Sequence, residues 1–262
     1  MQLGLEGKSA AVAAGSRGIG RATARMLAME GARVAICGRD AARIDLAARE
    51  LEAETKTKVI GVVADVGSAD DCRSFIAQTA RELGGVDILV TNTGGPPPGR
   101  FDAVGWTDWE AAFRVTLANV VHLVAAAAPL MRANRWGRIV NIASVSAKQP
   151  IDGLVLSNAF RPAILGLAKT LSYELGSDAI TVNTVCPGYT RTERLEELAD
   201  SRAKAGTSRD QVFDDLARNT ALGRIADPDE IASVIAFLCS ERASYLTGVT
   251  LAVDGGAIRG LC

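Results

Sequence analysis

The sequence has few of the features that mark secreted or metal-binding proteins. Its five cysteines are scattered, odd in number and free of CxxC spacing, which argues against a disulfide framework and against a zinc site. They are Cys37, Cys72, Cys186, Cys239 and Cys262. The opening stretch MQLGLEGKSAAVAAG has no basic segment followed by a long apolar run, so no secretory signal is expected. These absences predict a cytoplasmic protein with reduced thiols and no metal.

The chain also lacks a surplus of either charge, because 29 lysines and arginines are balanced by 30 acidic residues. A nearly neutral chain gives no indication of binding to nucleic acid or to an anionic membrane surface. The most apolar stretch, VTLANVVHLVAAAAPLM, is interrupted by Asn119, His122 and Pro129 and is too short to span a bilayer comfortably. A small molecule is therefore the expected partner.

Short apolar runs alternate with longer helical patterns from one end of the chain to the other. Strands are predicted at 8–14, 33–37, 59–64, 86–91, 138–143, 180–185 and 249–253. Helices are predicted near 19–30, 41–54, 69–83, 107–132, 158–175 and 228–240. Strands without polar alternation, separated by helices, indicate a parallel sheet covered on both faces. The pattern predicts a single α/β domain over residues 1–262.

One segment interrupts this alternation. Residues 191–220, RTERLEELADSRAKAGTSRDQVFDDLARNT, are strongly charged and follow a predicted strand at the edge where ligands bind in parallel sheets. A charged helical insertion is usually a solvated surface, but this position also suits a cover over a substrate pocket. We interpret the segment as a substrate lid, with the solvated surface as the alternative.

The first predicted strand runs into a glycine-rich turn, AAGSRGIGRATARMLAMEG, which opens a helix. Gly15, Gly18 and Gly20 allow a tight turn and let backbone N–H groups approach a pyrophosphate at the helix N-terminus. A strand precedes the turn and a second strand follows at the expected distance. The turn therefore predicts a dinucleotide site.

The second predicted strand ends in AICGRD, where a site that reads a ribose 2′-hydroxyl would place an acidic residue. Arg39 stands there instead, and Arg17 lies in the glycine turn. Two guanidinium groups suit a 2′-phosphate, which they hold through charge-assisted hydrogen bonds. The alternative, that Arg39 is merely exposed while Asp40 caps the next helix, is compatible with phosphate binding. We predict NADP(H) rather than NAD(H) as the cofactor.

Six blocks in the sequence resemble the short-chain dehydrogenase/reductase family, and most of all its 3-oxoacyl-carrier-protein reductase branch. They are GSRGIG, ADV at 64–66, TNTGG at 91–95, RIVNIASVSA at 138–147, CPGYTRT at 186–192 and GRIADPDEIASVIAFLCSERASYLTGVTLAVDGG. The resemblance covers essentially the whole chain. It implies a Rossmann-type fold, a doubly wound parallel sheet of about seven strands with helices on both faces. It also implies an oxidoreductase acting on a carbonyl or alcohol, assembled as a homotetramer or dimer.

The resemblance further implies which residues contact the cofactor. Asp65 would meet the adenine, residues 92–94 would line the ribose side, and Pro187 would flank the nicotinamide. The full set is Gly15, Ser16, Arg17, Gly18, Ile19, Gly20, Arg39, Asp65, Val66, Asn92, Thr93, Gly94, Arg161, Pro187, Gly188, Thr190 and Thr192. In one departure, the family's first glycine falls on Ala14, which is tolerable there only if its φ is negative.

The catalytic positions depart much further from the family. Its serine matches Ser144, but Ser157 stands at the tyrosine position and Arg161 at the lysine position. The following residues, AILGLAKTLSYEL, match the family's helix without a gap, and the asparagine position falls on Thr116. A serine hydroxyl is a far weaker acid than a tyrosine beside a lysine. Arg161 keeps the positive charge but effectively never releases its proton.

The source of the proton therefore stays open. Lys148 and Asp152 lie between the two serines, and Tyr189 follows the Pro-Gly turn, so each is an alternative acid. Three readings remain: an NADP(H)-dependent oxidoreductase with an atypical proton route, an inactive dinucleotide-binding sensor or partner subunit, and an enzyme of another class on the same scaffold. We predict the first, with catalytic positions Ser144, Ser157, Arg161 and Thr116.

Overall fold

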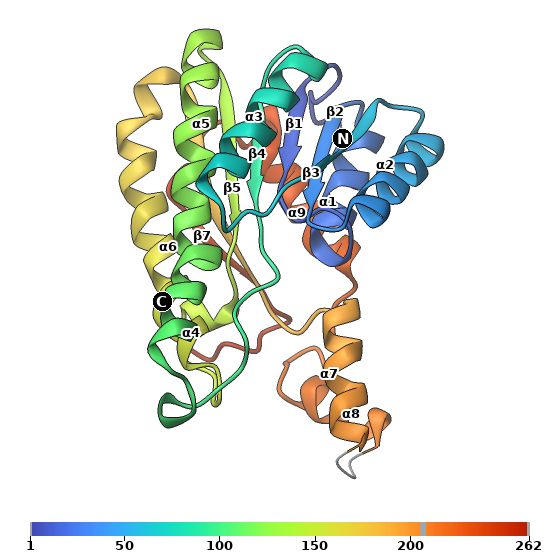
Figure 1. The fold of residues 1–262 in the computed structure, drawn as a ribbon, viewed down its shortest axis with the longest axis vertical. Coiled ribbons are helices and arrows are strands. Elements are labelled where there is room, and N and C mark those ends of the chain that lie inside the picture. Colours follow the sequence, from blue (N-terminus) through green and yellow to red (C-terminus); the bar gives the residue numbers. More distant parts are fainter. Residues whose placement is uncertain (1, 205–207, 261–262) are drawn as a thin grey trace.

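Seven parallel strands form the centre of the computed structural model, which describes residues 2–204 and 208–260 (Figure 1). Their order across the sheet is β3-β2-β1-β4-β5-β6-β7, and every neighbouring pair runs parallel. The strands are β1 (Ser9–Val12), β2 (Arg33–Gly38), β3 (Val59–Val63), β4 (Ile88–Thr91), β5 (Gly137–Ile142), β6 (Ile180–Pro187) and β7 (Thr250–Val253). The predicted Rossmann-type sheet of seven strands is confirmed. Cys262 and the centre of the predicted lid, 205–207, lie outside the described residues.

The strand order reverses between β1 and β4, which pair with each other in the middle of the sheet. In such sheets the two flanking connections leave in opposite directions and open a crevice at the carboxyl ends of the strands. Every residue of β1, β4, β5 and β6 is buried. Burial on both faces is the reason that these strands lack the alternating pattern of a half-exposed sheet.

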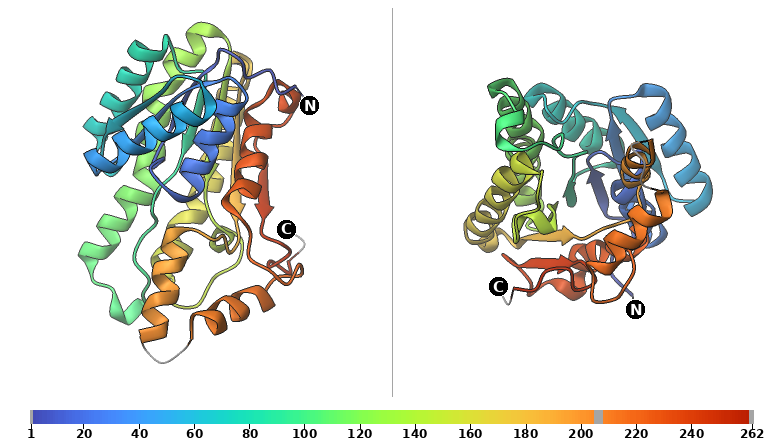
Figure 2. Two further views of the ribbon diagram at one scale, coloured as in Figure 1. Left: turned by 90° about the vertical axis from the view of Figure 1, so that its right-hand side faces the viewer. Right: turned by 90° about the horizontal axis from the view of Figure 1, so that it is seen from below.

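Helices cover both faces of the sheet, as the two views of Figure 2 show. One face carries α1 (Gly18–Met29), α2 (Ala41–Thr55) and α9 (Pro228–Cys239). The other carries α3 (Ala69–Leu83), α5 (Asn119–Asn134) and α6 (Val155–Glu174). These helices and their approximate bounds agree with the sequence prediction.

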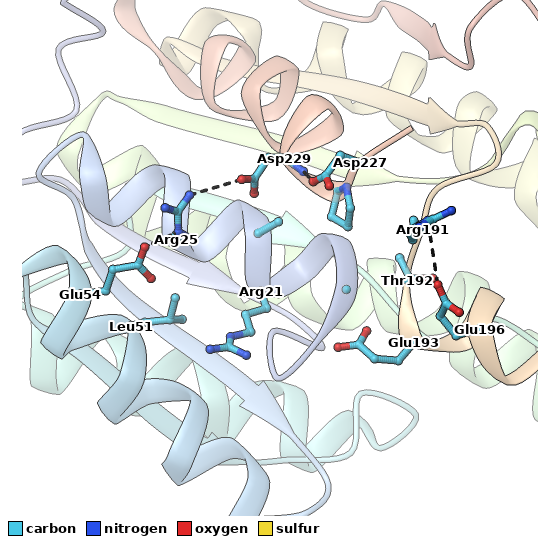
Figure 3. Close-up of a pocket in the computed structure, with 13 residues that line it drawn as sticks. Arg21, Arg25, Leu51, Glu54, Arg191, Thr192, Glu193, Glu196, Asp227 and Asp229 are labelled. Carbon is cyan, nitrogen blue, oxygen red and sulfur yellow. Dashed lines mark hydrogen bonds and ion pairs between the residues drawn. The ribbon is translucent and has the colours of Figure 1, made fainter. Parts of the chain in front are cut away.

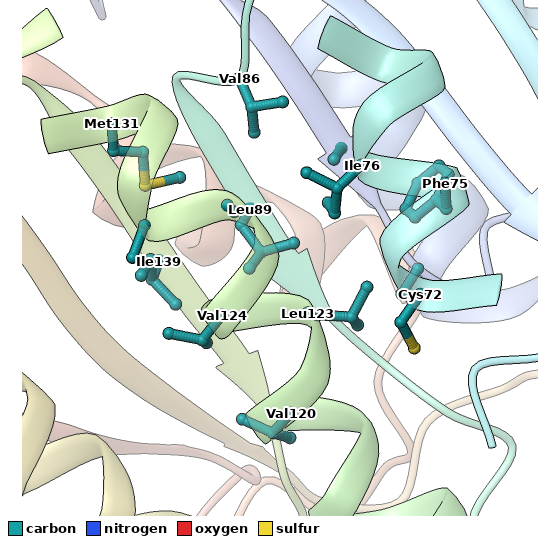
Figure 4. Close-up of a cluster of buried hydrophobic side chains, with 14 of the residues drawn as sticks. Cys72, Phe75, Ile76, Val86, Leu89, Val120, Leu123, Val124, Met131 and Ile139 are labelled. Atoms are coloured by element: carbon teal, nitrogen blue, oxygen red, sulfur yellow. The ribbon is translucent and has the colours of Figure 1, made fainter. Parts of the chain in front are cut away.

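Figure 4 shows the core cluster between the sheet and the second helical layer. Phe75 and Ile76 of α3 and Leu123 of α5 pack in the same cluster as Leu89 of β4 and are almost completely shielded from solvent. Large apolar side chains from three separate elements thus meet in one place. Their burial holds α3 and α5 on the sheet.

The helix predicted at 107–132 is longer than expected and is not uniform. α4 (Trp106–Phe113) passes through a π-helical turn, Arg114–Ala118, directly into α5. The run has 29 residues and its most apolar 18-residue window has a mean hydropathy of 1.5, so by length and composition alone it could cross a membrane, and the expectation that the apolar stretch is too short was wrong. Half of its most apolar window is buried, and α5 packs on β4 and β5 as a core helix does.

The charged segment after β6 folds as two helices, α7 (Glu193–Lys204) and α8 (Arg209–Arg218), which lie below the body of the molecule in Figure 1. They have a small apolar cluster of their own, formed by Ala199, Val212 and Leu216. The segment is therefore a folded unit at the carboxyl edge of the sheet.

Replacing Phe75 with alanine is expected to lower the free energy of unfolding by about 3–5 kcal/mol, because the change leaves a cavity at a fully buried position. Phe101→Ala is the control, since Phe101 is 74% exposed and its loss should cost less than about 0.5 kcal/mol. Urea unfolding followed by circular dichroism measures both variants. Equally small losses would contradict the packing of α3 against the sheet.

Candidate active site

The predicted cofactor and catalytic residues gather at the carboxyl ends of the strands. Asn92 directly follows β4, Ser144 lies just beyond β5, and Pro187 is the last residue of β6. The glycine-rich turn joins β1 to α1 at the same edge. The parallel sheet brings residues from four distant parts of the chain to the crevice where the strand order reverses.

The turn between β1 and α1 is packed too tightly for side chains at two positions. A β-carbon on Gly20 would collide with the carbonyl oxygen of Ala14, and one on Gly15 would lie 2.7 Å from the Ile36 side chain. The same Ala14 carbonyl accepts a hydrogen bond from Nδ2 of Asn92 at 3.4 Å. The turn is thus tied to the end of β4, and it delivers the N-terminus of α1 to the crevice.

Ala14 itself adopts a φ of +47°, which lies in the left-handed region. The expectation of a negative φ at this position was wrong. The Gly15 N–H donates to the carbonyl of Cys37 at 3.0 Å, and with the Asn92 contact this holds the turn in its shape. Tertiary contacts therefore impose a conformation that costs an alanine about 1–2 kcal/mol.

The two arginines predicted to bind a 2′-phosphate have different surroundings. Arg39 is exposed at the end of β2, and beside it the Asp40 carboxylate accepts the Arg43 N–H at 3.0 Å and caps α2. Arg17 of the glycine turn instead forms an ion pair with Glu197 of α7 at 2.8 Å. Exposure of Arg39 and helix capping by Asp40 occur together, and Arg39 remains open to a ligand.

The other predicted cofactor residues line the same edge. Oδ1 of Asp65 accepts the Gly67 N–H at 2.9 Å, which shapes the loop after β3. Thr190 Oγ1 donates to the carbonyl of Gly188 at 3.1 Å. Thr192 packs against the glycine turn, since a β-carbon on Gly18 would lie 3.2 Å from its methyl group.

The predicted catalytic serines and arginine form a hydrogen-bonded chain. The Oγ atoms of Ser157 and Ser146 are 2.9 Å apart, and Nε of Arg161 donates to Ser157 Oγ at 3.2 Å. Ser144 Oγ accepts the Ser146 N–H at 3.1 Å. Ser146 was not predicted as a site residue, although the SVS spacing places it two residues after Ser144. The chain Ser146–Ser157–Arg161 joins the first turns of α6 to the loop after β5.

Arg161 is only 9% exposed, and main-chain carbonyls hold its guanidinium. Its Nη1 donates to the carbonyl oxygens of Ile142 and Ala143 at the end of β5. Burial, and then the nearby charge of Arg194, lower the pKa of Arg161 to about 10. Arg161 is therefore still protonated at neutral pH, and a full positive charge lies beside the Ser157 hydroxyl.

Thr116 lies on the π-helical turn, which packs against α6. Its buried Oγ1 and the Oδ1 of the neighbouring Asn119 have no hydrogen-bond partner in the described structure. Such π turns often mark functional sites, and unpartnered buried oxygens are positions for ordered water. The structure records no hydrogen bond from Thr116 to the serine–arginine chain, so Thr116 lies near the chain without being part of it.

The alternative acids are placed less favourably. The Tyr189 ring packs against the apolar cluster of α7 and α8, and Asp152 is exposed in its loop. Lys148 lies near the thiol of Cys186. Burial raises the pKa of that thiol, and the Ser144 backbone and the Lys148 charge offset only part of the rise.

α7 contributes two side chains that the sequence did not predict. Nη1 and Nη2 of Arg194 donate to the carbonyl oxygens of Gly95 and Pro96 at 3.2 Å and 2.9 Å. Glu197 forms the ion pair with Arg17 across 180 positions in the chain. In the sequence, only the high charge of 191–220 pointed to a role for this segment, and it did not reveal that Arg194 and Glu197 contact the loop after β4 and the glycine turn.

A groove of about 530 Å³ lies beside the glycine turn, between α1, α2, α9 and the start of α7 (Figure 3). Its charged side chains pair with one another, as Arg25 does with Glu54 at 2.6 Å and with Asp229 at 3.4 Å. The groove shares Gly18 and Thr192 with the cofactor edge but contains none of the predicted catalytic residues. It is therefore a neighbour of the candidate site.

Comparisons with known proteins place the chain among reductases. A family model described as enoyl-(acyl carrier protein) reductase matches residues 13–257. Dehydrogenase/reductase SDR family member 4 of Oryctolagus cuniculus is 35% identical over 254 residues, which cover 97% of this chain and 94% of that protein. The 3-oxoacyl-[acyl-carrier-protein] reductase FabG of Aquifex aeolicus is 32% identical over 98% of this chain and 99% of that protein.

Solved structures agree with these relatives. L-sorbose reductase from Gluconobacter frateurii, complexed with NADPH and L-sorbose, superposes with a TM-score of 0.97 at 32% identity and covers 100% of both chains. YwfH, an NADPH-dependent reductase involved in bacilysin biosynthesis, gives a TM-score of 0.92 at 27% identity, covering 97% of this chain and 99% of YwfH.

Ala14→Gly is expected to raise the free energy of unfolding by up to about 1 kcal/mol, because glycine adopts the left-handed conformation without strain. Scanning calorimetry measures this as a rise of a few °C in Tm. Ala53→Gly is the matched control at an exposed helical position of α2, where the same change should lower stability by about 0.5–1 kcal/mol. A loss of stability in both variants would contradict the strained turn.

Proposed function

Because this chain belongs to the short-chain dehydrogenase/reductase family, we propose that it is an NADP(H)-dependent oxidoreductase acting on a carbonyl or alcohol substrate. The observation that carries the proposal is the meeting of the glycine turn with the Ser146–Ser157–Arg161 chain at one edge of the sheet. A dinucleotide site and a proton-donating group lie together there, as carbonyl reduction requires.

The glycine turn fits the pyrophosphate of the cofactor. Gly15 and Gly20 have no room for a β-carbon, so the backbone can approach the phosphates closely at the N-terminus of α1. Arg39 stands free at the tip of β2, where it matches a 2′-phosphate. When bound, the cofactor supplies the hydride, and the chain's own residues supply orientation and the proton.

The proton route runs through hydroxyl groups. Ser157 Oγ accepts a hydrogen bond from Nε of Arg161 and shares one with the Ser146 hydroxyl, in which either oxygen can donate. When Ser146 donates, the O–H of Ser157 is free to face the substrate oxygen. Ser157 gives this proton to the carbonyl oxygen, Ser146 returns one to Ser157, and solvent water restores Ser146. Arg161 keeps its proton throughout, and its positive charge lowers the energy of the transient negative charge on the Ser157 oxygen.

We further propose a cytoplasmic homo-oligomer, a tetramer or a dimer. Tyr245 is fully exposed, Tyr173 is 79% exposed, and Leu251 is exposed on β7, the last strand of the sheet. Large apolar side chains beside an unpaired strand suit contact with another subunit. Cys37, Cys72, Cys186 and Cys239 are free thiols, as expected for a reducing compartment.

The proposal predicts NADPH binding, followed by fluorescence, and NADPH oxidation with at least one ketone, aldehyde or 3-oxoacyl thioester. Tight NADPH binding without turnover on any carbonyl would favour an inactive dinucleotide-binding sensor. The presence of Ser157 at the family's tyrosine position is the observation that supports this second function. No binding would contradict both functions.

Arg39→Ala is expected to raise the Kd for NADPH by about tenfold to a hundredfold, because a charge-assisted hydrogen bond to the 2′-phosphate is lost. The Kd for NADH should stay the same, since NADH lacks that phosphate. Arg49→Ala is the control, because Arg49 pairs with Asp45 on the outer surface of α2. Parallel weakening of both cofactors would contradict a 2′-phosphate contact at Arg39.

Ser157→Ala is expected to lower kcat by at least about tenfold while the Kd for NADPH stays nearly constant, because the direct proton donor is removed. Ser172→Ala is the control: Ser172 is another buried serine of α6, and it bonds only to the Lys169 carbonyl within its own helix. Steady-state kinetics measure the rates.

Since Arg161 must stay charged, kcat should fall as the pH rises through about 10.

The double variant Ser157→Tyr with Arg161→Lys separates two forms of this route. A rate that falls or stays level would support a route built around the present residues. A large rise would show that the pocket keeps the geometry of a tyrosine–lysine pair, and that Ser157 and Arg161 are the poorer pair.

A further inference from the structure

Two arginines converge on Gly95 in the loop after β4. Nη2 of Arg161 lies 3.0 Å, and Nη1 of Arg194 lies 3.4 Å, from the position that a β-carbon would take on Gly95. Gly95 has a φ of +73°, a conformation that side chains rarely adopt, and the absence of a β-carbon lets both guanidinium groups approach the main chain there closely. The two groups come from opposite sides of the crevice, one from α6 and one from α7.

Neither guanidinium has a carboxylate partner among residues 2–204 and 208–260. Arg161 bonds to two main-chain carbonyls and to Ser157, and its Nη2 forms no recorded hydrogen bond within these ranges. Arg194 bonds only to the carbonyls of Gly95 and Pro96. Two neighbouring positive charges, one of them nine-tenths buried, are costly without an anion between them.

Glu197 contacts Arg17 at 2.8 Å and not Arg194, so its charge acts on Arg194 only from a distance. The cofactor supplies phosphates, but the pyrophosphate belongs at the glycine turn, where Gly18 contacts Thr192. Ribose hydroxyls can accept hydrogen bonds from Arg161 but carry no charge. A ligand anion other than the cofactor's would satisfy both guanidinium groups at Gly95.

We propose that Arg161 and Arg194 together bind a carboxylate of the substrate, so that the substrate is an oxo acid. This rests on the proposed reductase function and names the substrate class of the same site. A planar carboxylate matches a pair of guanidinium groups, which hold it by charge-assisted hydrogen bonds in a defined orientation.

The position of Ser157 limits the length of the substrate. Nε of Arg161 bonds to Ser157 Oγ at 3.2 Å, and Nη2 of the same guanidinium is the group aimed at Gly95. A carbonyl oxygen at Ser157 and a carboxylate at Nη2 are then separated by only a few atoms. This spacing favours 2-oxo and 3-oxo acids over acids whose carbonyl lies far from the carboxylate.

The test uses matched pairs of probes with wild type and Arg194→Gln. Rates are measured with acetoacetate and with methyl acetoacetate, and the binding of oxamate and of neutral oxamide is measured by thermal shift in the presence of NADP⁺. Arg191→Gln is the control. Arg191 lies three positions before Arg194 in the chain, carries the same charge, is exposed and pairs with Glu196.

Wild type is expected to favour acetoacetate over its ester in kcat/KM by about tenfold or more, and to be stabilised by oxamate but not by oxamide. Arg194→Gln should lose most of that preference and of the oxamate shift, whereas its Kd for NADPH stays within about twofold. Arg191→Gln should resemble wild type in all of these measurements.

Other outcomes separate this proposal from the reductase function. Oxamate stabilisation that depends on Arg194, without NADPH turnover on any carbonyl, would support the carboxylate site and contradict the reductase. Turnover with equal rates on acid and ester in both proteins would overturn the carboxylate site alone. A loss of NADPH affinity in Arg194→Gln of tenfold or more, with acid and ester affected equally, would assign Arg194 to the pyrophosphate and overturn the proposal.

Discussion

The candidate site depends on one buried positive charge, the guanidinium of Arg161. It bonds to the carbonyls of Ile142 and Ala143, which extend beyond the sheet at the end of β5, and it bonds to the hydroxyl of Ser157. A buried charge needs polar partners and strand-end carbonyls need donors, so the carbonyls meet part of the need of Arg161 and leave its Nη2 for a ligand. These hydrogen bonds join α6 to the end of β5 and hold the Ser157 hydroxyl, the group that we propose as the proton donor.

Charged side chains of α7 contact the loops on either side of Arg161. α7 reaches both sides of the crevice: Glu197 pairs with Arg17 in the glycine turn, and Arg194 bonds to the carbonyls of Gly95 and Pro96. These contacts support the interpretation of 191–220 as a lid, because a purely solvated helix would not bridge the two walls of a ligand site. They also bring a second positive charge close to the first.

Most of the fold could be predicted because its signals are local. Unbroken apolar runs indicate buried parallel strands, and the helices between them follow from apolar spacing within a few turns. The errors have tertiary causes. The π turn at Arg114–Ala118 lets α4 and α5 continue as one helix, and Ala14 is held at a positive φ by Asn92 and Cys37 from other strands.

The sequence by itself determined the seven-stranded sheet, the dinucleotide turn and the presence of Ser157 and Arg161 at one helix start. Only the tertiary structure decided that Ser146 completes the hydroxyl chain and that Arg194 meets Arg161 at Gly95. Helices and strands follow from interactions between near neighbours in the chain. The Ser146–Ser157 hydrogen bond joins residues 11 positions apart and the Arg17–Glu197 ion pair joins residues 180 positions apart, so these partners meet only once the packed sheet has set the distances.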